Sequence, residues 1–244
     1  MPIAMPPPRF FCETPLAAGG RIELPAALAH HAQRVLRLAD GTPIVLFDGL
    51  GGQYPAVLRI EGRRTLAELG AHAAIDCELR GQLVLIQGLA SGDKMDWVVE
   101  KAVELGISEL WPVAAERSVL RLSGPRLEKR LDHWRAIVRA ASEQCGRNRL
   151  MVVHPPAPLA HCLDTVHGPA LFCHPEGPLD FRMALDNVHD RLTLMVGPEG
   201  GWSPDELALA QRKGLIGTRF GPRVLRTETA GLALASAATV LLDW

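Results

Sequence analysis

Hydrophobic and polar residues follow two different patterns along this chain, and the change falls near residue 80. Before it, short apolar runs are separated by glycine-containing turns such as Asp48–Gly52 and Glu61-Gly62, which is typical of strands. Residues 1–80 are therefore predicted to form a small, mostly β, barrel-like domain, with proline-rich residues 1–8 flexible. Its strands are expected at Arg21–Leu24, Ile44–Phe47, Tyr54–Ile60 and Ala71–Leu79, with a helix at Ala27–Leu38.

Residues 81–244 alternate between strand-like and helix-like segments. Helices are predicted at Lys94–Leu105, ended by Gly106, and at Pro125–Cys145, ended by Gly146, because apolar residues recur there every three or four positions. Such alternation predicts an α/β domain with a parallel sheet covered by helices, whose ligands bind at the carboxyl ends of the strands. The strands are expected at Leu83–Gln87, Glu109–Val113, Leu150–Val153, Ala170–Cys173, Leu192–Val196 and Ile216–Phe220.

Composition excludes several classes of protein. With 244 residues, of which 48% are hydrophobic, the chain can bury a substantial core, which argues against general disorder. Its longest apolar-rich stretch, Ala230–Leu242, is too short to span a bilayer, and no signal peptide is recognisable. We therefore expect a cytoplasmic protein without a membrane partner. The five scattered cysteines indicate free thiols, and His154, His161 and Cys162 fit no familiar zinc spacing, so no metal is predicted.

Charge is distributed unevenly, although the net charge is only −1. Five basic residues and no acidic one lie between Arg212 and Arg226. Two local basic stretches on a neutral protein favour an anionic partner at one surface; the alternative is a solvated helix face and a loop. The second stretch has three opposing acidic residues and eight basic ones: Arg121, Arg126, Lys129, Arg130, Arg135, Arg139, Arg147 and Arg149.

The loop Gly197-Pro-Glu-Gly-Gly201 directly follows a predicted strand. Its glycines have no Cβ, so their backbone groups can approach a ligand closely. The following helix has a clear start, with Ser203 as N-cap, Pro204 at the first helical position and Glu206 completing a capping box. The loop matches neither a dinucleotide fingerprint nor a phosphate-binding loop. A tight strand-to-helix turn is the structural alternative to a ligand site.

Two further segments combine bends with arginines. Phe220–Ala230 contains the bend Gly221-Pro222, then Arg223 and Arg226, and leads into a final helix with Thr227 as its expected N-cap. That helix is rich in alanine, which suits either a packed core or a subunit interface. Glu143–Arg149 closes the long basic helix; arginines there suit both the helix C-terminus and RNA phosphates.

These three segments, Gly197–Ser203, Gly221–Thr229 and Glu143–Arg147, closely resemble the RsmE-type ribosomal RNA uridine-N3 methyltransferases of the SPOUT superfamily. The similarity covers nearly the whole chain in order. Trp202 and Phe220 depart from the usual phenylalanine and leucine. Further matching segments are Pro8–Phe10, His31–Arg37, Phe47–Gly49, Lys94–Trp97, Glu100-Lys101, Glu104–Gly106 and Glu116–Ser118.

The resemblance implies a fold and an activity. Residues 1–80 would form a PUA-like RNA-binding domain, and residues 81–244 a SPOUT domain with a deep trefoil knot, a rare exception to the rule that chains do not thread loops. The protein would be a homodimer with its active site near the subunit boundary. Its substrate would be one uridine of 16S ribosomal RNA in the small ribosomal subunit, and its methyl donor S-adenosylmethionine.

The resemblance also implies roles for individual residues. Predicted RNA contacts are Arg9, Arg34, Arg37, Arg147, Arg149 and Arg223. The predicted cofactor-binding residues are Leu171, Cys173, His174, Gly197, Pro198, Glu199, Gly200, Gly201, Phe220, Gly221, Val224, Leu225 and Thr227.

Uracil N3 carries a proton at neutral pH and lies on the Watson–Crick edge, so the uridine must be unpaired before it reacts. The negative charge that then spreads onto O2 and O4 calls for a nearby cation. We assign this catalytic role to Arg226. Glu199 either accepts the N3 proton or holds the cofactor.

Two other functions are compatible with the sequence. The chain could be a SPOUT methyltransferase that acts on a base or ribose of transfer RNA, and mapping of the methylated nucleoside distinguishes this function from uridine-N3 methylation of ribosomal RNA. A non-catalytic RNA-binding assembly factor could keep the fold without the chemistry, and such a protein would bind S-adenosylmethionine weakly or not at all.

Overall fold

The computed structural model describes residues 6–120 and 122–244. Contacts divide the chain into two compact units, one formed by Met1–Glu78 with Ser142–Leu150, the other by Leu79–Ala141 with Met151–Trp244. Arg121 of the basic stretch and residues 1–5 of the proline-rich start lie outside the described residues.

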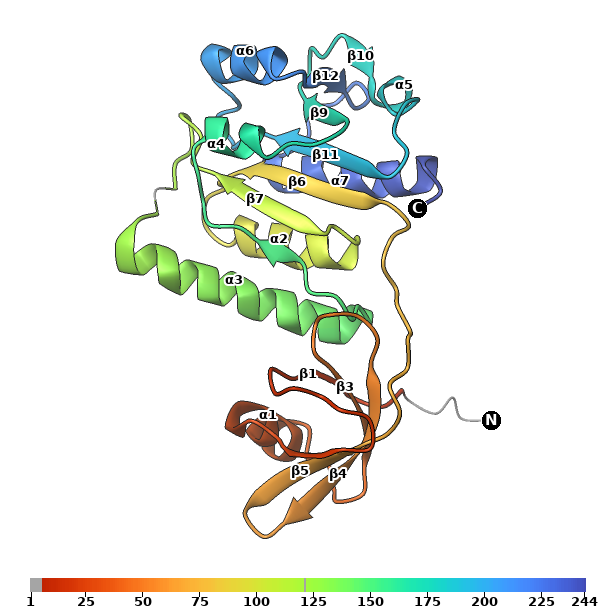
Figure 1. Ribbon diagram of the computed structural model, residues 1–244. Helices are drawn as coiled ribbons and strands as arrows, with labels where there is room; N and C mark the ends of the chain where they lie inside the picture. The colour runs from red at the N-terminus through yellow and green to blue at the C-terminus, as the bar shows by residue number, and fades with distance from the viewer. Residues whose placement is uncertain (1–5, 121) are drawn as a thin grey trace. The chain divides into compact units, whose positions relative to one another are not determined.

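The first unit is built on a five-stranded sheet with the order β1-β3-β4-β5-β2 (Figure 1). Helix α1 (Ala26–His30) continues into a π-helical turn, η1 (His31–Val35). Phe10, Ile44 and Leu58 are almost completely buried in the core of this unit. Most strand pairs are antiparallel, whereas β1 pairs parallel with β3. The strands are β1 (Arg9–Phe11), β2 (Arg21–Glu23), β3 (Pro43–Phe47), β4 (Tyr54–Glu61) and β5 (Arg64–Leu69).

The last strand predicted for this unit is wrong. The partner of β4 is β5, and residues 71–79 form only an isolated bridge between Gln53 and Ala73. The reason is the turn at Gly62, whose positive φ of 61° closes a tight hairpin, so the second strand begins immediately. Strand β1 was missed because three residues are too few to show a periodic pattern.

Residues 142–150 are joined to the first unit by buried polar groups. Arg9 donates hydrogen bonds to Asn148 Oδ1 (2.6 Å) and to the carbonyl of Gly146 (3.2 Å). Arg147, only 4% exposed, forms an ion pair with Glu78 at 2.5 Å. A segment predicted from sequence to belong to the second domain therefore packs with the first unit.

The second unit contains a seven-stranded sheet in the order β10-β12-β9-β11-β6-β7-β8, and every pair is parallel. The predicted parallel α/β sheet is confirmed. The strands are β6 (Gln82–Gly88), β7 (Glu109–Val113), β8 (Val152–Val153), β9 (Ala170–Cys173), β10 (Leu179–Asp180), β11 (Arg191–Val196) and β12 (Ile216–Arg219).

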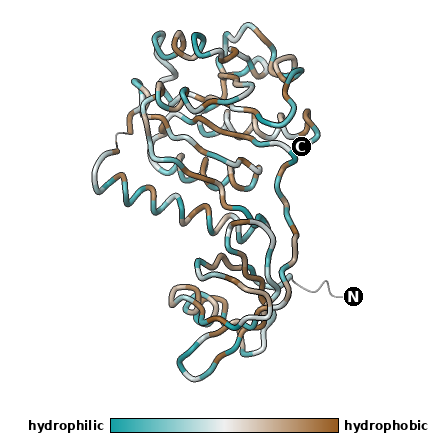
Figure 2. The backbone as a smooth tube through the Cα atoms, in the orientation of Figure 1, coloured by the Kyte–Doolittle hydropathy of each residue, from teal (hydrophilic) through white to brown (hydrophobic). Residues whose placement is uncertain are grey.

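Helices cover both faces of this sheet (Figure 1). Leu85 of β6 faces helix α7, whereas Ile86 and Met195 pack with Cys162 of α4 and Ala210 of α6. The central strands β6 and β11 are accordingly hydrophobic along their length (Figure 2), because both faces are buried. The helices are α2 (Lys94–Glu104), α3 (Gly124–Cys145), α4 (Leu159–Asp164), α5 (Phe181–Ala184), α6 (Pro204–Arg212) and α7 (Thr227–Leu241).

No helix within residues 6–120 and 122–244 is long and apolar enough to cross a membrane. The capping box predicted for α6 is present, with Ser203 and Glu206 bonding each other's backbone N–H groups. The trefoil knot stays a prediction.

Asp96 ties α2 to α3 within the second unit. Its carboxylate accepts hydrogen bonds from Trp134 Nε1 (2.9 Å), Arg130 Nη1 (3.2 Å) and His133 Nε2 (2.9 Å). The Trp134 side chain is completely buried, so its indole N–H has no access to water if this acceptor is removed.

We expect Asp96→Ala to lower the free energy of unfolding by about 1–3 kcal/mol, the usual cost of a buried donor without an acceptor. Asp96→Asn is the matched control, since its amide oxygen can still accept the Trp134 bond. Urea unfolding followed by tryptophan fluorescence measures both. Equal stability of wild type and Asp96→Ala contradicts this role for Asp96.

Candidate functional site

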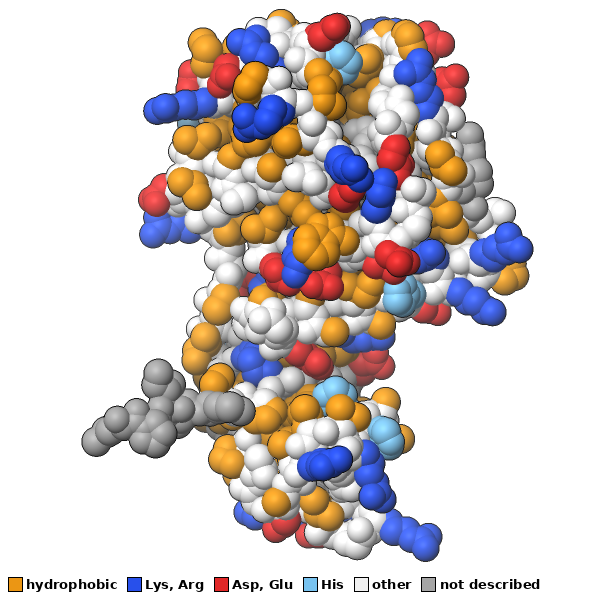
Figure 3. Space-filling model, turned by 180° about the vertical axis from the view of Figure 1, so that it is seen from behind, with side chains coloured by type: hydrophobic (Ala, Val, Ile, Leu, Met, Phe, Trp, Pro, Cys, Tyr) orange, Lys and Arg blue, Asp and Glu red, His pale blue; other side chains and the backbone are white. Residues whose placement is uncertain are grey.

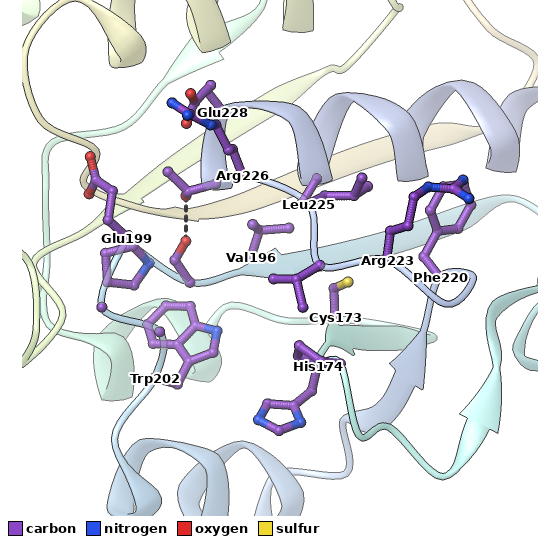
Figure 4. Close-up of a pocket in the computed structure, with 18 of the residues that line it drawn as sticks. Cys173, His174, Val196, Glu199, Trp202, Phe220, Arg223, Leu225, Arg226 and Glu228 are labelled. Carbon is purple, nitrogen blue, oxygen red and sulfur yellow. Dashed lines mark hydrogen bonds between the residues drawn. The ribbon is translucent and has the colours of Figure 1, made fainter.

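Four loops meet at one edge of the seven-stranded sheet. Strands β12, β9, β11 and β6 are neighbours and run parallel, so the segments that follow them emerge together. They enclose a cavity of about 1030 Å³ (Figure 4). Its walls are residues 173–175 after β9, residues 196–202 after β11, residues 219–228 and 230 after β12, and the side chains of Lys94 and Arg117.

The structure brings together most residues predicted to bind the cofactor. Leu171 is the exception: it does not line the cavity, and its side chain is 1% exposed inside β9. It faces the sheet's core because strand residues alternate between faces. The residues that do line the cavity are Cys173, His174, Gly197, Pro198, Glu199, Gly200, Gly201, Phe220, Gly221, Val224, Leu225 and Thr227.

Glycines shape the cavity in two ways: two of them permit bends of the chain, and a third permits a close approach of two segments. Gly201 and Gly221 have φ values of +68° and +66°, which residues with a Cβ rarely adopt. A Cβ on Gly88, at the end of β6, would lie 2.4 Å from the backbone nitrogen of Pro198. The loop after β11 can therefore lie directly on β6, with its backbone forming the cavity wall.

Thr227 joins three of these segments. It is the first residue of α7, and Arg226 takes the N-cap position without a side-chain cap bond, so the predicted N-cap role of Thr227 is wrong. Its hydroxyl instead donates to the carbonyl of Gly197 and accepts from Gln87 Nε2 (2.9 Å). The long-range bond exists because Thr227 points into the sheet edge and is 7% exposed.

Glu199 is held by groups from the segment after β6. Its Oε1 accepts hydrogen bonds from Ser91 N (3.0 Å), Ser91 Oγ (2.7 Å) and Lys94 Nζ (3.0 Å). Burial raises the pKa of this carboxyl, but the hydrogen bonds from Ser91 and Lys94 outweigh it and lower the pKa to about 2. Glu199 is consequently ionised at neutral pH and a weak proton acceptor.

Lys94 also faces a second carboxylate. Its Nζ lies 3.8 Å from Oε2 of Glu228, whose side chain is 17% exposed. This Oε2 atom is buried and accepts no hydrogen bond from the described residues. Lys94 thus lies between a carboxylate on the loop after β11 and another in the first turn of α7.

Two predicted arginines line the cavity at different places. In the view of Figure 4, Arg226 and Glu228 are drawn at one end of the cavity, and Arg223 and Phe220 at the other. Both residues are exposed, and within the described part of the chain neither side chain forms a hydrogen bond or ion pair. Their guanidinium groups are available to an external anion or base.

The remaining predicted RNA contacts differ in accessibility. Arg34 and Arg37 are exposed in and just after η1, and Arg149 is 57% exposed although paired with Asp76 at 3.1 Å. Arg9 and Arg147 bind partners inside the first unit, and their RNA contacts stay predictions.

The basic stretch on α3 is also partly neutralised. Arg130 pairs with Asp96, and Arg135 pairs with Asp132 at 3.3 Å. Figure 3 shows basic and acidic side chains interspersed over one face of the molecule. The number of basic residues in a stretch of sequence is therefore a poor guide to the RNA-binding surface of this protein.

Three residues in or next to the cavity have positions that the sequence did not assign a role. Trp202 is 5% exposed, lines the cavity and has an indole nitrogen without a hydrogen-bond partner among the described residues. Ser91 holds Glu199. Lys94 lies in a segment that resembles the methyltransferase family, but the sequence assigned it no role. Only the fold places Ser91 and Lys94 beside Glu199, more than a hundred residues away.

The histidines first considered as metal ligands have other contacts. His154 stacks on Trp111, with ring centroids 3.5 Å apart, and its Nε2 lies 3.1 Å from Glu109 Oε2. Among the residues that the structure describes, no three His, Cys, Asp or Glu side chains are grouped to hold a metal.

Comparisons with known proteins find similarity over both units. Residues 77–239 match the model of an RNA methyltransferase domain, and residues 24–67 match an RNA methyltransferase PUA domain. The chain is 32% identical to ribosomal RNA small subunit methyltransferase E of Synechocystis sp., over 91% of this chain and 74% of that protein. The Mycobacterium bovis protein of the same name is 32% identical, over 86% and 83%.

A solved structure is also similar. The ribosomal RNA small subunit methyltransferase E of Neisseria gonorrhoeae, bound to S-adenosylmethionine, superimposes with a TM-score of 0.88 at 35% identity, covering 96% of this chain and 98% of that one.

The Thr227 hydroxyl gives a second test. We expect Thr227→Val, which keeps the side-chain shape, to lower the free energy of unfolding by about 1–3 kcal/mol, because Gln87 Nε2 and the Gly197 carbonyl lose a buried partner. Thr227→Ser retains the hydroxyl and should lose much less. Chemical denaturation measures both. A Thr227→Val protein as stable as wild type would show that the bond contributes nothing.

Proposed function

The chain belongs to the RNA methyltransferase family of ribosomal RNA small subunit methyltransferase E, and from this membership we propose that it methylates N3 of one uridine in 16S ribosomal RNA. It is an S-adenosylmethionine-dependent RNA methyltransferase. The observation that carries the proposal is the cavity between the bends at Gly197–Gly201 and Phe220–Arg226, which Thr227 joins.

The cavity suits S-adenosylmethionine on physical grounds. Its volume of about 1030 Å³ is at the upper end of small-molecule sites, which are mostly apolar with few polar groups. The backbone at Gly201 and Gly221 lies open to it, since a Cβ there would meet no atom within 4 Å. Val196, Leu225 and Trp202 supply apolar wall for an adenosyl group, and Glu199 is an anion for a cationic ligand. When bound, the cofactor supplies an electrophilic methyl group.

The protein's own residues then have three tasks. The apolar wall and bends align the methyl donor with the incoming base, which lowers the barrier by fixing orientation. Arg226, exposed at the cavity, stabilises the negative charge that develops on O2 or O4. Arg223, at the other end, holds a phosphate. Glu199 stays ionised and holds the loop through Ser91 and Lys94.

RNA binding is assigned mainly to the first unit. The PUA match at residues 24–67 includes the exposed Arg34 and Arg37, and we propose that these, with Arg149 and Arg223, contact 16S ribosomal RNA of the small ribosomal subunit. Guanidinium groups bind phosphates and also stack on unpaired bases. We propose that the enzyme works in the cytoplasm, where the ribosomal subunit is its partner.

We further propose that the protein is a homodimer. Helices α2 and α7 pack together, and they expose Trp97 (52%), Val240 (79%) and Leu241 (46%). Exposed apolar side chains near small residues such as Ala237 suit close packing of a second copy.

Methyl transfer to purified small subunits that lack the modification tests the proposed function. The expected product is N3-methyluridine at a single site, identified by nucleoside mass spectrometry and mapped along the RNA. Methylation of transfer RNA or of a ribose would favour the rival SPOUT activity. Absence of both transfer and cofactor binding would indicate a non-catalytic factor.

The role of Arg226 is tested with the same assay. We expect Arg226→Ala to slow single-turnover methylation about a hundredfold, the usual loss for one charge-stabilising donor. Cofactor affinity should change little, because the cation acts on the uracil oxygens. Arg223→Ala is the comparison: it should weaken RNA binding and reduce its salt dependence. An unchanged rate for Arg226→Ala at saturating RNA removes this assignment.

A further inference from the structure

Transfer of a methyl group to uracil N3 needs a group that takes up the N3 proton. The side chains lining the cavity that can accept a proton are Cys173, His174, Glu199 and Glu228. The remaining ionisable groups there are lysine and arginines, which are positively charged at neutral pH. The hydrogen bonds around the four candidates distinguish them.

Cys173 and His174 are unsuited to this task. Burial raises the pKa of the Cys173 thiol, so it stays protonated at neutral pH. His174 Nδ1 accepts the backbone N–H of Glu176 at 3.2 Å, which places the proton of the neutral ring on Nε2. Its one basic nitrogen is therefore already bound, and the other is a donor.

Glu199 already accepts hydrogen bonds through its Oε1 atom. Two N–H or O–H groups of Ser91 and the ammonium of Lys94 converge on its Oε1, and they lower the pKa to about 2 against the opposing effect of burial. A carboxylate stabilised in this way releases a proton readily and takes one up poorly.

Glu228 differs from Glu199 in its hydrogen bonds. Its Oε2 is buried at the cavity and accepts no hydrogen bond from the described residues. A buried carboxylate oxygen without a donor is costly to maintain, and it is an open acceptor for an N–H group of a ligand. Glu228 lies two residues after Arg226, which we assign to the uracil oxygens, and both residues line the cavity (Figure 4).

We propose that Glu228, rather than Glu199, is the proton acceptor of the methylation, an inference that rests on the proposed function. The N–H bonding pair of uracil N3 forms the new N3–C bond, and the proton moves to Glu228 Oε2. The S–C bonding pair stays on sulfur, so the sulfonium becomes a neutral thioether. Atoms and charge balance, and the proton then leaves to water.

Charged groups around Glu228 support this division of roles. Lys94 on α2 lies 3.8 Å from its Oε2 and 3.0 Å from Glu199 Oε1. Arg226 lies in the segment before α7, and Glu228 itself lies in the first helical turn, where the dipole favours an anion. Lys94 and the helix N-terminus thus face Glu228 from two elements, and Oε2, which has no donor among the described residues, can accept a hydrogen bond from N3–H.

The test compares Glu228→Gln with Glu199→Gln, two isosteric changes of carboxylates that share Lys94. Single-turnover methylation of small subunits is measured across pH, and S-adenosylmethionine affinity is measured separately by calorimetry. We expect Glu228→Gln to bind the cofactor like wild type but to react about 10²–10⁴-fold more slowly at neutral pH. The deficit should shrink as pH rises, because uracil then loses its proton without help.

The control variants should behave differently. Glu199→Gln should weaken cofactor affinity or thermal stability while keeping the wild-type shape of the pH profile. Glu228→Asp retains a carboxylate and should recover part of the rate together with that profile. Thermal unfolding and cofactor binding show whether each variant is folded.

Each other outcome decides against the proposal. A wild-type rate in Glu228→Gln, or a deficit that does not change with pH, excludes Glu228 as the acceptor. Loss of cofactor affinity or of folding in both Glu228 variants makes it a binding or structural residue. A pH-dependent deficit in Glu199→Gln alone assigns the role to Glu199. If wild-type protein forms no N3-methyluridine, the proposed function itself fails, which is a separate result.

Discussion

The buried hydroxyl of Thr227 holds the site together. It bonds the Gly197 carbonyl after β11 and Gln87 at the end of β6, and these three residues come from distant parts of the chain. The Thr227 hydroxyl and the Gln87 amide are buried, so each needs the other as a partner. The bond fixes the start of α7 against the loop after β11, and every other cavity group is positioned relative to that junction.

This junction lets two carboxylates of the same cavity differ in chemistry. Glu199 lies on the loop that packs over β6, where Ser91 and Lys94 reach it. Glu228 directly follows Thr227 in the first turn of α7, and its Oε2 has no donor among the described residues. One carboxylate is thus bound by its surroundings, and the other remains open to a ligand. Lys94, between them, links both to α2.

The arginines show the same dependence on surroundings. Arg9 and Arg147 satisfy carbonyls and a carboxylate inside the first unit, whereas Arg223 and Arg226 are exposed at the cavity. All four are alike in sequence and stand beside glycine, proline or apolar residues. Burial, which is a property of packing, decides which guanidinium groups stabilise the fold and which can meet RNA.

The sequence by itself determined the parallel α/β sheet, its main strands and helices, the Ser203 cap and the two glycine bends, because these features follow from local periodicity, capping and backbone freedom. It misplaced β5, since the tight turn at Gly62 makes the next strand begin at Arg64. It also misjudged Thr227, whose partners lie up to 140 residues away. Only the tertiary structure decided that Leu171 is buried, that Lys94 lies between two carboxylates, and that Glu199 Oε1 accepts three hydrogen bonds. Hydrogen bonds and pKa values depend on neighbours in space, and those neighbours are set by the whole fold.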